Sequence, residues 1–135
     1  MPRARVVLDT NVVISALFRF PSVSSAAFSI ALMCDHYTTE AILAEYEGVL
    51  KRRKFGFADD TVDGIMRNIR QTSKLVKTDQ WVNVSPDPTD NKFLECCLAA
   101  EADFLITGNA KDFPRTFRQT RIVNPREFLD QYLHL

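Results

Sequence analysis

The stretch RVVLDTN places a carboxylate, Asp9, directly after a short apolar run. Apolar runs such as residues 5–8 are typical of buried strands, and a buried strand rarely ends in an acid without a reason. The polar residues Thr10 and Asn11 follow, and a second apolar run then begins. A carboxylate held at the end of a buried strand could bind a metal ion or act as a nucleophile.

The segment DPTDNKFLECCL supplies a second acid, Asp90, at the start of an expected helix. At about 100° per residue, Asp90 lies over the apolar face of that helix rather than opposite to it. The apolar face is formed by Phe93, Leu94, Cys97 and Leu98. An aspartate at this position is also a common helix cap, so spacing alone leaves two interpretations. Asp87 fits a turn residue that could assist.

A third acid comes from the helix expected after Thr39, in the segment EAILAEYEGVL. The apolar stripe of this helix is centred near Tyr46. Glu45 and Glu47 each lie about 100° from that centre, on opposite flanks. Helical geometry does not choose between them, and most exposed glutamates on such helices are simply solvated.

Strand and helix patterns alternate along the chain. Strands are expected at residues 5–9, 36–39, 81–84, 103–107 and 121–123. Helices are expected to start at Ser22–Ser25, at Thr39 (running through Phe55), at Asp59 or Asp60, and at Asp90. A last helix is expected after Asn124, with Pro125 as its first residue and Glu127 completing a capping box. Strands separated by helices predict a three-layer α/β/α sandwich with an open parallel sheet.

In such a sheet, ligands bind beyond the carboxyl ends of the strands, where strand order reverses. Asp9 lies at the carboxyl end of the first strand, and Asn109 and Asp112 follow the strand at residues 103–107. Acids that converge on this edge repel one another unless a cation is present. Their oxygens suit Mg²⁺ or Mn²⁺, and such ions can activate water against a phosphodiester.

Composition indicates one soluble domain over residues 1–135, with 46% hydrophobic and 25% charged residues. Because 17 basic residues balance 17 acidic ones, an anionic partner needs a local patch, such as Lys51–Lys54 or Arg115, Arg118 and Arg121. We expect Cys34, Cys96 and Cys97 to be reduced core residues. No signal peptide or membrane-spanning run is evident, so we expect a cytoplasmic protein.

Three motifs in order, VVLDTNVVISALF, ILAEYEGVLKRRKF and DPTDNKFLECCLAAEADFLITGN, resemble the PIN-domain family of metal-dependent ribonucleases. The resemblance extends to IVNPREFL and is closest to small stand-alone prokaryotic members, the VapC-like toxins of toxin–antitoxin pairs. It implies cleavage of single-stranded RNA with Mg²⁺ or Mn²⁺, a small cognate antitoxin and a homodimer, in which the helix near residues 22–33 could take part.

The resemblance also assigns residues. It implies that Asp9, Glu45 and Asp90 are the catalytic metal ligands, with Asn11 and Ser15 in supporting positions. Many members carry an aspartate after TG, where this chain has Asn109. An amide oxygen binds a divalent cation less strongly than a carboxylate does. Further candidate ligands are Asn109, Asp112 and Asp87.

Two other classes of function are compatible with parts of this pattern. Asn109 would suit a catalytically silent PIN-like module that binds RNA or protein. An aspartate ending the first strand could also be the nucleophile of a phosphatase. A haloacid-dehalogenase-like phosphatase, however, needs a second aspartate two residues later, where this chain has Asn11.

Overall fold

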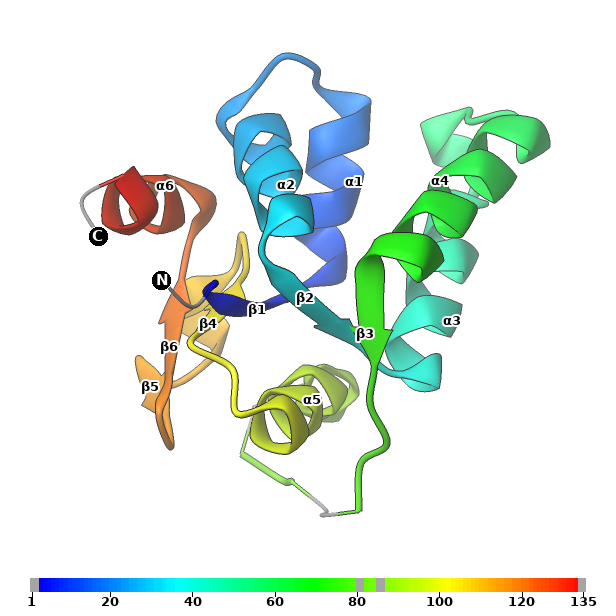
Figure 1. Ribbon diagram of the computed structural model, residues 1–135. Coiled ribbons are helices and arrows are strands. Elements are labelled where there is room, and N and C mark those ends of the chain that lie inside the picture. Colours follow the sequence, from blue (N-terminus) through cyan, green and yellow to red (C-terminus); the bar gives the residue numbers. More distant parts are fainter. Residues whose placement is uncertain (1–2, 80–81, 85–86, 134–135) are drawn as a thin grey trace.

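The computed structural model describes residues 3–79, 82–84 and 87–133, which form one sheet with helices on both faces (Figure 1). The strands are β1 (Arg5–Leu8), β2 (Asp35–Thr38), β3 (Ser73–Leu75), β4 (Phe104–Ile106), β5 (Thr116–Phe117) and β6 (Thr120–Val123). The helices are α1 (Thr10–Phe18), α2 (Val23–Met33), α3 (Glu40–Leu50), α4 (Asp59–Thr72), α5 (Asn91–Ala100) and α6 (Pro125–Leu133). Short 3-10 helices are η1 (Arg53–Phe55), η2 (Pro88–Asp90) and η3 (Ala110–Asp112).

The strand order in the sheet is β3-β2-β1-β4-β6-β5. All paired strands run parallel except β5 and β6, which form an antiparallel edge. The chain passes from β1 to β2 on one side and later returns to β4 on the other side of β1. Strand order therefore reverses between β1 and β4, and a crevice opens at their carboxyl ends. The predicted α/β sandwich with an open, mostly parallel sheet is confirmed.

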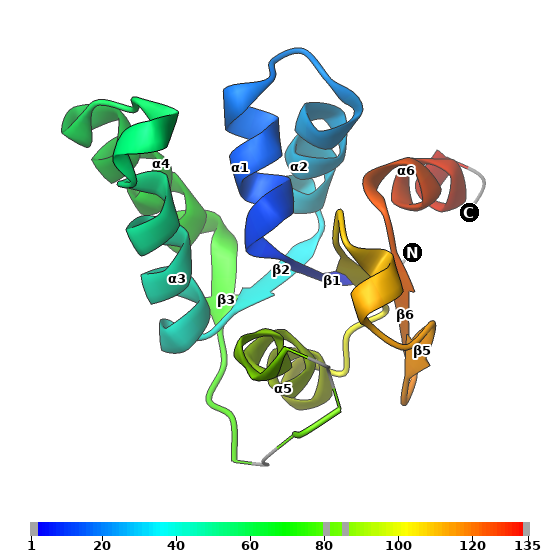
Figure 2. The ribbon, with the colours of Figure 1, turned by 180° about the vertical axis from the view of Figure 1, so that it is seen from behind.

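Helices α1, α2 and α6 lie on one side of the sheet and α5 on the other, as two opposite views show (Figures 1 and 2). Helices α3 and α4 pack against each other beside β2 and β3, and α3 also contacts both α1 and α5. This arrangement brings α1, α3 and α5 together around the carboxyl end of β1.

The central strands are the most buried part of the molecule. Val6, Val7 and Leu8 of β1 have no exposed surface, and Leu105 and Ile106 of β4 are equally buried. Each such side chain stabilises the fold by about 1.5–3 kcal/mol relative to exposure. A strand covered on both faces therefore appears as a continuous apolar run, which is what residues 6–8 show.

Several helix starts predicted from sequence are confirmed. Ser22 and Ser25 form a reciprocal capping box at the start of α2. The Thr39 hydroxyl accepts a hydrogen bond from the backbone N–H of Ile42 at 3.1 Å at the start of α3. Asn124 and Glu127 form the predicted box at α6, with bonds of 2.7 and 3.0 Å.

Two predicted elements differ from the structure, and two strands were not predicted. Residues 82–84 form no strand, and Trp81 lies outside the described residues. The strand beside β2 is instead β3, which follows α4 without a turn signal and is largely exposed. Helix α3 ends at Leu50 rather than at Phe55, because Arg52 has extended backbone (φ −64°, ψ 133°). The antiparallel strand β5 was also not predicted.

The prediction that the cysteines are reduced core residues is confirmed, because Cys34, Cys96 and Cys97 are buried and form no disulfide. Burial raises the pKa of the Cys96 thiol to about 12, so it stays protonated.

Among the described residues, no single helix has the length and hydropathy to cross a membrane. Only α1 and α2 taken together reach that length and composition, and the chain bends by 119° between them.

Candidate active site

Asp9 joins the two central strands at their carboxyl ends. Its backbone N–H donates to the carbonyl of Ile106 at 2.9 Å, and its own carbonyl accepts from Val12 at 3.1 Å. Asp9 is the N-cap residue of α1, yet its carboxylate makes no capping bond. The side chain is only 5% exposed, so a buried carboxylate is held at the crevice without a structural role in the helix.

Hydrogen bonds from β4 and α1 fix this carboxylate. The Thr107 hydroxyl donates to Oδ2 of Asp9 at 2.7 Å, and the Asn11 amide donates to the same oxygen at 3.2 Å. The Asn11 Oδ1 in turn accepts from the backbone N–H of Gly108 at 2.9 Å. A Cβ at Gly108 would lie 3.3 Å from that oxygen, so glycine permits the close approach. The DTN and TGN segments therefore form one hydrogen-bonded unit.

The structure separates the two glutamates that helical geometry left equivalent. Glu45 accepts hydrogen bonds from the Thr10 hydroxyl and from the Lys92 ammonium group, and it is only partly exposed. Glu47 instead pairs with Lys51 at 3.1 Å on the outer surface of α3. The buried phenol of Tyr46, between them in sequence, donates to the carbonyl of Leu8 and anchors α3 to the end of β1.

Asp90 ends η2 and is the N-cap residue of α5, and its carboxylate makes no capping bond. Its pKa is raised to about 6, mainly because burial disfavours the charged form, and then because Asp9, Asp87 and Glu45 are negatively charged. Lys92 opposes this shift. Burial also raises the pKa of Asp9, with a smaller contribution from Glu45, although the Thr107 hydrogen bond lowers it. The acids therefore influence one another electrostatically.

Asp9, Glu45 and Asp90 line one pocket of about 370 Å³. The supporting residues Asn11 and Ser15 also line it. The remaining lining residues are Thr10, Ile14, Val49, Arg52, Phe55 and Thr89. Side chains from α1, α3, η1 and η2 thus meet over the carboxyl end of β1.

The further candidate ligands do not line this pocket. Asp87 is exposed and accepts hydrogen bonds from the backbone and hydroxyl of Thr89 at 3.0 and 2.8 Å. Asn109 is exposed at the start of η3, and its backbone N–H donates to the Thr107 hydroxyl at 3.0 Å. Asp112 is exposed at the end of the same 3-10 helix.

The donor set at the pocket suits a hard divalent cation. Within the described residues, no three His, Cys, Asp or Glu side chains converge closely enough to hold a metal ion as they stand. The Lys92 ammonium group occupies one oxygen of Glu45. Still, partly buried carboxylates with raised pKa values are stabilised in their charged form by a cation, and oxygen ligands are those that Mg²⁺ and Mn²⁺ prefer.

Sequence reasoning missed two residues that shape this site, Thr107 and Lys92. Arg52, which also lines the pocket, belongs to the basic segment Lys51–Lys54 that the sequence analysis considered for an anionic partner. Thr107 could have been found, because it follows the strand beside β1 and faces the same crevice. Lys92 directly follows the acidic segment, but no periodicity shows which acid it would contact.

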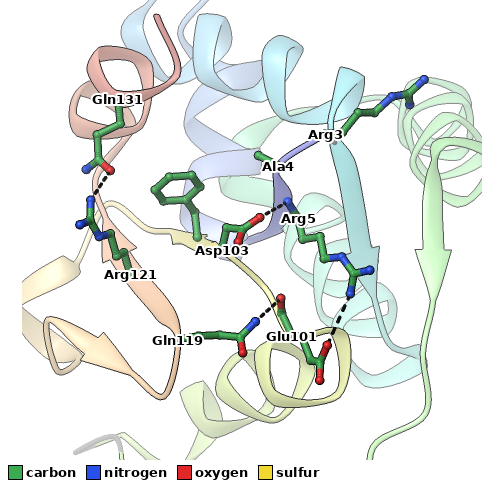
Figure 3. Close-up of a pocket in the computed structure, with 9 residues that line it drawn as sticks. Arg3, Ala4, Arg5, Glu101, Asp103, Gln119, Arg121 and Gln131 are labelled. Carbon is green, nitrogen blue, oxygen red and sulfur yellow. Dashed lines mark hydrogen bonds and ion pairs between the residues drawn. The ribbon is translucent and has the colours of Figure 1, made fainter. Parts of the chain in front are cut away.

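A larger cavity, of about 550 Å³, lies at the opposite, amino-terminal edge of the sheet (Figure 3). Several of its polar and charged groups bond one another. Asp103 accepts from the backbone N–H of Arg5 at 2.8 Å, Glu101 lies 3.9 Å from the Arg5 guanidinium, and Arg121 donates to Gln131 at 3.0 Å. We therefore place the candidate site at the smaller acidic pocket, where strand order reverses.

The comparisons with known proteins identify the family of the chain. The family model described as PIN domain matches residues 5–111, from β1 into η3. A search of curated proteins found no significant match. The chain belongs to the PIN-domain family. Members of this family are generally nucleases, and a nuclease-type function is what the membership supports.

Proposed function

We propose that the protein is a Mg²⁺- or Mn²⁺-dependent endoribonuclease that hydrolyses phosphodiester bonds of single-stranded RNA. One observation carries the proposal: three electrostatically coupled carboxylates line a single pocket at the strand-order reversal of a PIN domain. A nuclease needs negative groups there only if they hold cations, because bare carboxylates repel phosphate.

In this proposal Asp9, Glu45 and Asp90 hold the metal. When bound, the divalent ion supplies water activation and neutralises charge on the phosphodiester. Thr107 and Asn11 fix the orientation of the Asp9 carboxylate, and Thr10 does so for Glu45. Lys92 compensates the charge of Glu45 and offsets a small part of the rise in the pKa of Asp90.

The residues around the pocket have lesser roles. Ser15 faces the pocket from α1 and is a candidate to orient substrate or solvent. Asn109, Asp112 and Asp87 would act as additional ligands only through water or after a local rearrangement, because they lie outside the lining of the pocket.

We further propose a VapC-like toxin that acts in the cytoplasm as one nuclease domain and is inhibited by a small antitoxin. The order of its three motifs supports this assignment. The exposed apolar side chain of Met33, at the end of α2, is compatible with a protein partner or a homodimer contact there.

A matched pair of substitutions on α3 tests the proposed ligands. Glu45→Gln should lower Mn²⁺-dependent RNA cleavage by at least about 100-fold, because one carboxylate ligand becomes a neutral amide. Glu47→Gln, two residues away on the surface, should leave cleavage unchanged. The measurement is the single-turnover rate on a mixed single-stranded RNA pool.

Equal rates for the two variants would contradict the assignment of Glu45. If the folded wild-type protein binds RNA but does not cleave it with any metal, the catalytically silent module is the correct function. The amide at Asn109, in place of a carboxylate, is the observation that favours that second candidate.

A further inference from the structure

An aromatic cluster lies next to the acidic pocket. The Phe18 ring meets Phe55 and Phe57 edge-on, with centroids 5.8 and 6.5 Å apart, and the latter two rings stack at 6.2 Å. Phe18 is 53% exposed, and the neighbouring Phe20 is 79% exposed. The side chains of Phe18 and Phe20 are thus exposed to solvent, and the Phe18 ring packs against Phe55 and Phe57. The three contacting rings, together with the exposed Phe20 two residues after Phe18 in the sequence, are called the aromatic patch: Phe18, Phe20, Phe55 and Phe57.

Three basic side chains lie in the segment directly before Phe55 of the aromatic patch. Arg52, Arg53 and Lys54 connect α3 to Phe55, and all three are exposed. In the described part of the chain, none of the ion pairs involves them, whereas Lys51 pairs with Glu47. The Lys54 ammonium lies 5.1 Å from the centroid of the Phe55 ring. Positive charge is therefore concentrated beside exposed rings, in a protein with no net charge.

The patch is continuous with the acidic pocket. Arg52 and Phe55 line that pocket together with Asp9 and Asp90. Ile14 of α1 also lines the pocket, and Phe18 lies one helical turn further along the same face of α1. Nine residues of rise separate Asp9 from Phe18, which is about 14 Å along the helix. That distance corresponds to a few nucleotides of an extended strand.

We propose that the aromatic patch is a binding subsite for an unpaired RNA strand, a proposal that rests on the ribonuclease function proposed above. Bases stack on Phe18 and Phe20, and Arg52 and Arg53 contact the backbone phosphates on the way to the acidic pocket. Aromatic rings beside cations are the combination that binds single strands, because every base has a face to stack and every linkage carries a charge. A duplex cannot use the rings, since its bases are already stacked.

The test uses the double variant Phe18→Leu, Phe20→Leu, in which apolar character is kept and the aromatic face is lost. Its affinity for a short, fluorescently labelled single-stranded RNA is measured without metal and at several salt concentrations. Loss of stacking should weaken binding by at least about fivefold and leave the salt dependence unchanged. Arg52→Ala should weaken binding and reduce the salt slope by about 0.7, the contribution of one phosphate contact.

Met33→Leu is the matched control, because Met33 is 70% exposed on α2 and lies outside the patch. It should bind RNA as the wild type does. In cleavage assays the double variant should raise KM and leave kcat unchanged, since the acids are intact.

Three results would overturn the subsite. The first is a double variant that binds and cleaves RNA as well as the wild type does. This result would reject the subsite but not the proposed ribonuclease function. The second is loss of self-association in the double variant with unaltered RNA binding, which would make the patch a contact between copies of this chain. The third is a wild-type protein that binds no single-stranded RNA without metal: this rejects the subsite, and it rejects the ribonuclease as well if the protein also cleaves no RNA when Mn²⁺ or Mg²⁺ is added.

Discussion

At the scale of single residues, Asp90 is subject to opposing demands. Its position against Asp9, Asp87 and Glu45 is unfavourable for a charged carboxylate, and its pKa is raised to about 6. The folded state therefore binds more protons than the unfolded state between about pH 4 and pH 6. Stability contributed by this residue is largest below pH 4 and falls as the pH rises through 6. A carboxylate that costs stability in this way is typical of a functional site, which agrees with the proposed role of Asp90 as a metal ligand.

Asp90→Asn should remove this cost. We expect its melting temperature to exceed that of the wild type by a few degrees at pH 7.5 and to match it near pH 3.5, with solvent screening limiting the gain. Added Mn²⁺ should raise the melting temperature of the wild type but hardly that of the variant. Differential scanning calorimetry across pH, with the exposed α4 variant Asp63→Asn as control, makes the comparison. Identical pH profiles for wild type and Asp90→Asn would contradict it.

The sequence predicted individual site residues unevenly. Asp9 was identifiable because a carboxylate after three apolar residues is a local pattern. The choice between Glu45 and Glu47 was not available from the α3 pattern, since both lie on the flanks of the apolar stripe. Thr10 and Lys92, from α1 and α5, contact Glu45, so tertiary packing distinguishes the two. Only the family resemblance had favoured Glu45.

At the scale of elements, β2 contains an unusual histidine. His36 has no exposed surface, and within the described residues neither ring nitrogen has a hydrogen-bond partner. Burial lowers the pKa of His36 to about 4, so the ring is neutral at physiological pH. The folded state binds fewer protons than the unfolded state between about pH 4 and pH 6.5. Stability from this residue is therefore lost as the pH falls through that range.

His36→Leu should stabilise the protein by about 1 kcal/mol at pH 7, because an apolar side chain replaces unpaired polar atoms. The gain should increase as the pH falls from 6.5 to 5. Urea unfolding at pH 7 and pH 5 measures both values. A variant less stable than the wild type at both pH values would show that the imidazole makes a stabilising contact.

Element prediction succeeded where the chain carries local signals and failed where it does not. The capping residues Ser22, Thr39 and Asn124 mark helix starts that the structure confirms. Strand β3 has only three residues and no apolar alternation, because it is an exposed edge strand paired through its backbone to β2. Residues 82–84 have the strand-like composition but no strand partner, so their pattern was misleading.

At the scale of the whole molecule, alternating elements predicted a parallel sheet but not the order of its strands. Placing β4 beside β1 depends on contacts almost 100 residues apart in sequence, such as Val6 with Phe104. That pairing brings Thr107 against Asp9 and creates the crevice. Local patterns carry no information on such pairings, whereas the order of the three PIN-like motifs did.

Overall charge also acts at this scale. With no net charge, the protein has little long-range attraction for RNA, so under the two proposals the local combination of Arg52, Arg53 and the aromatic patch captures the substrate. Acids at the pocket and cations beside it would then place a phosphodiester next to the metal ligands without attracting nucleic acid over the rest of the surface.

The most direct test of the account is cleavage of a mixed single-stranded RNA pool by purified protein with Mn²⁺, Mg²⁺ or EDTA, beside Asp9→Asn. Asparagine matches the shape of Asp9 and removes its charge, so the fold should be retained. We predict cleavage that requires a divalent metal and disappears in Asp9→Asn. Folded wild-type protein that leaves RNA intact with every metal, or cleavage that persists in EDTA, would contradict the account.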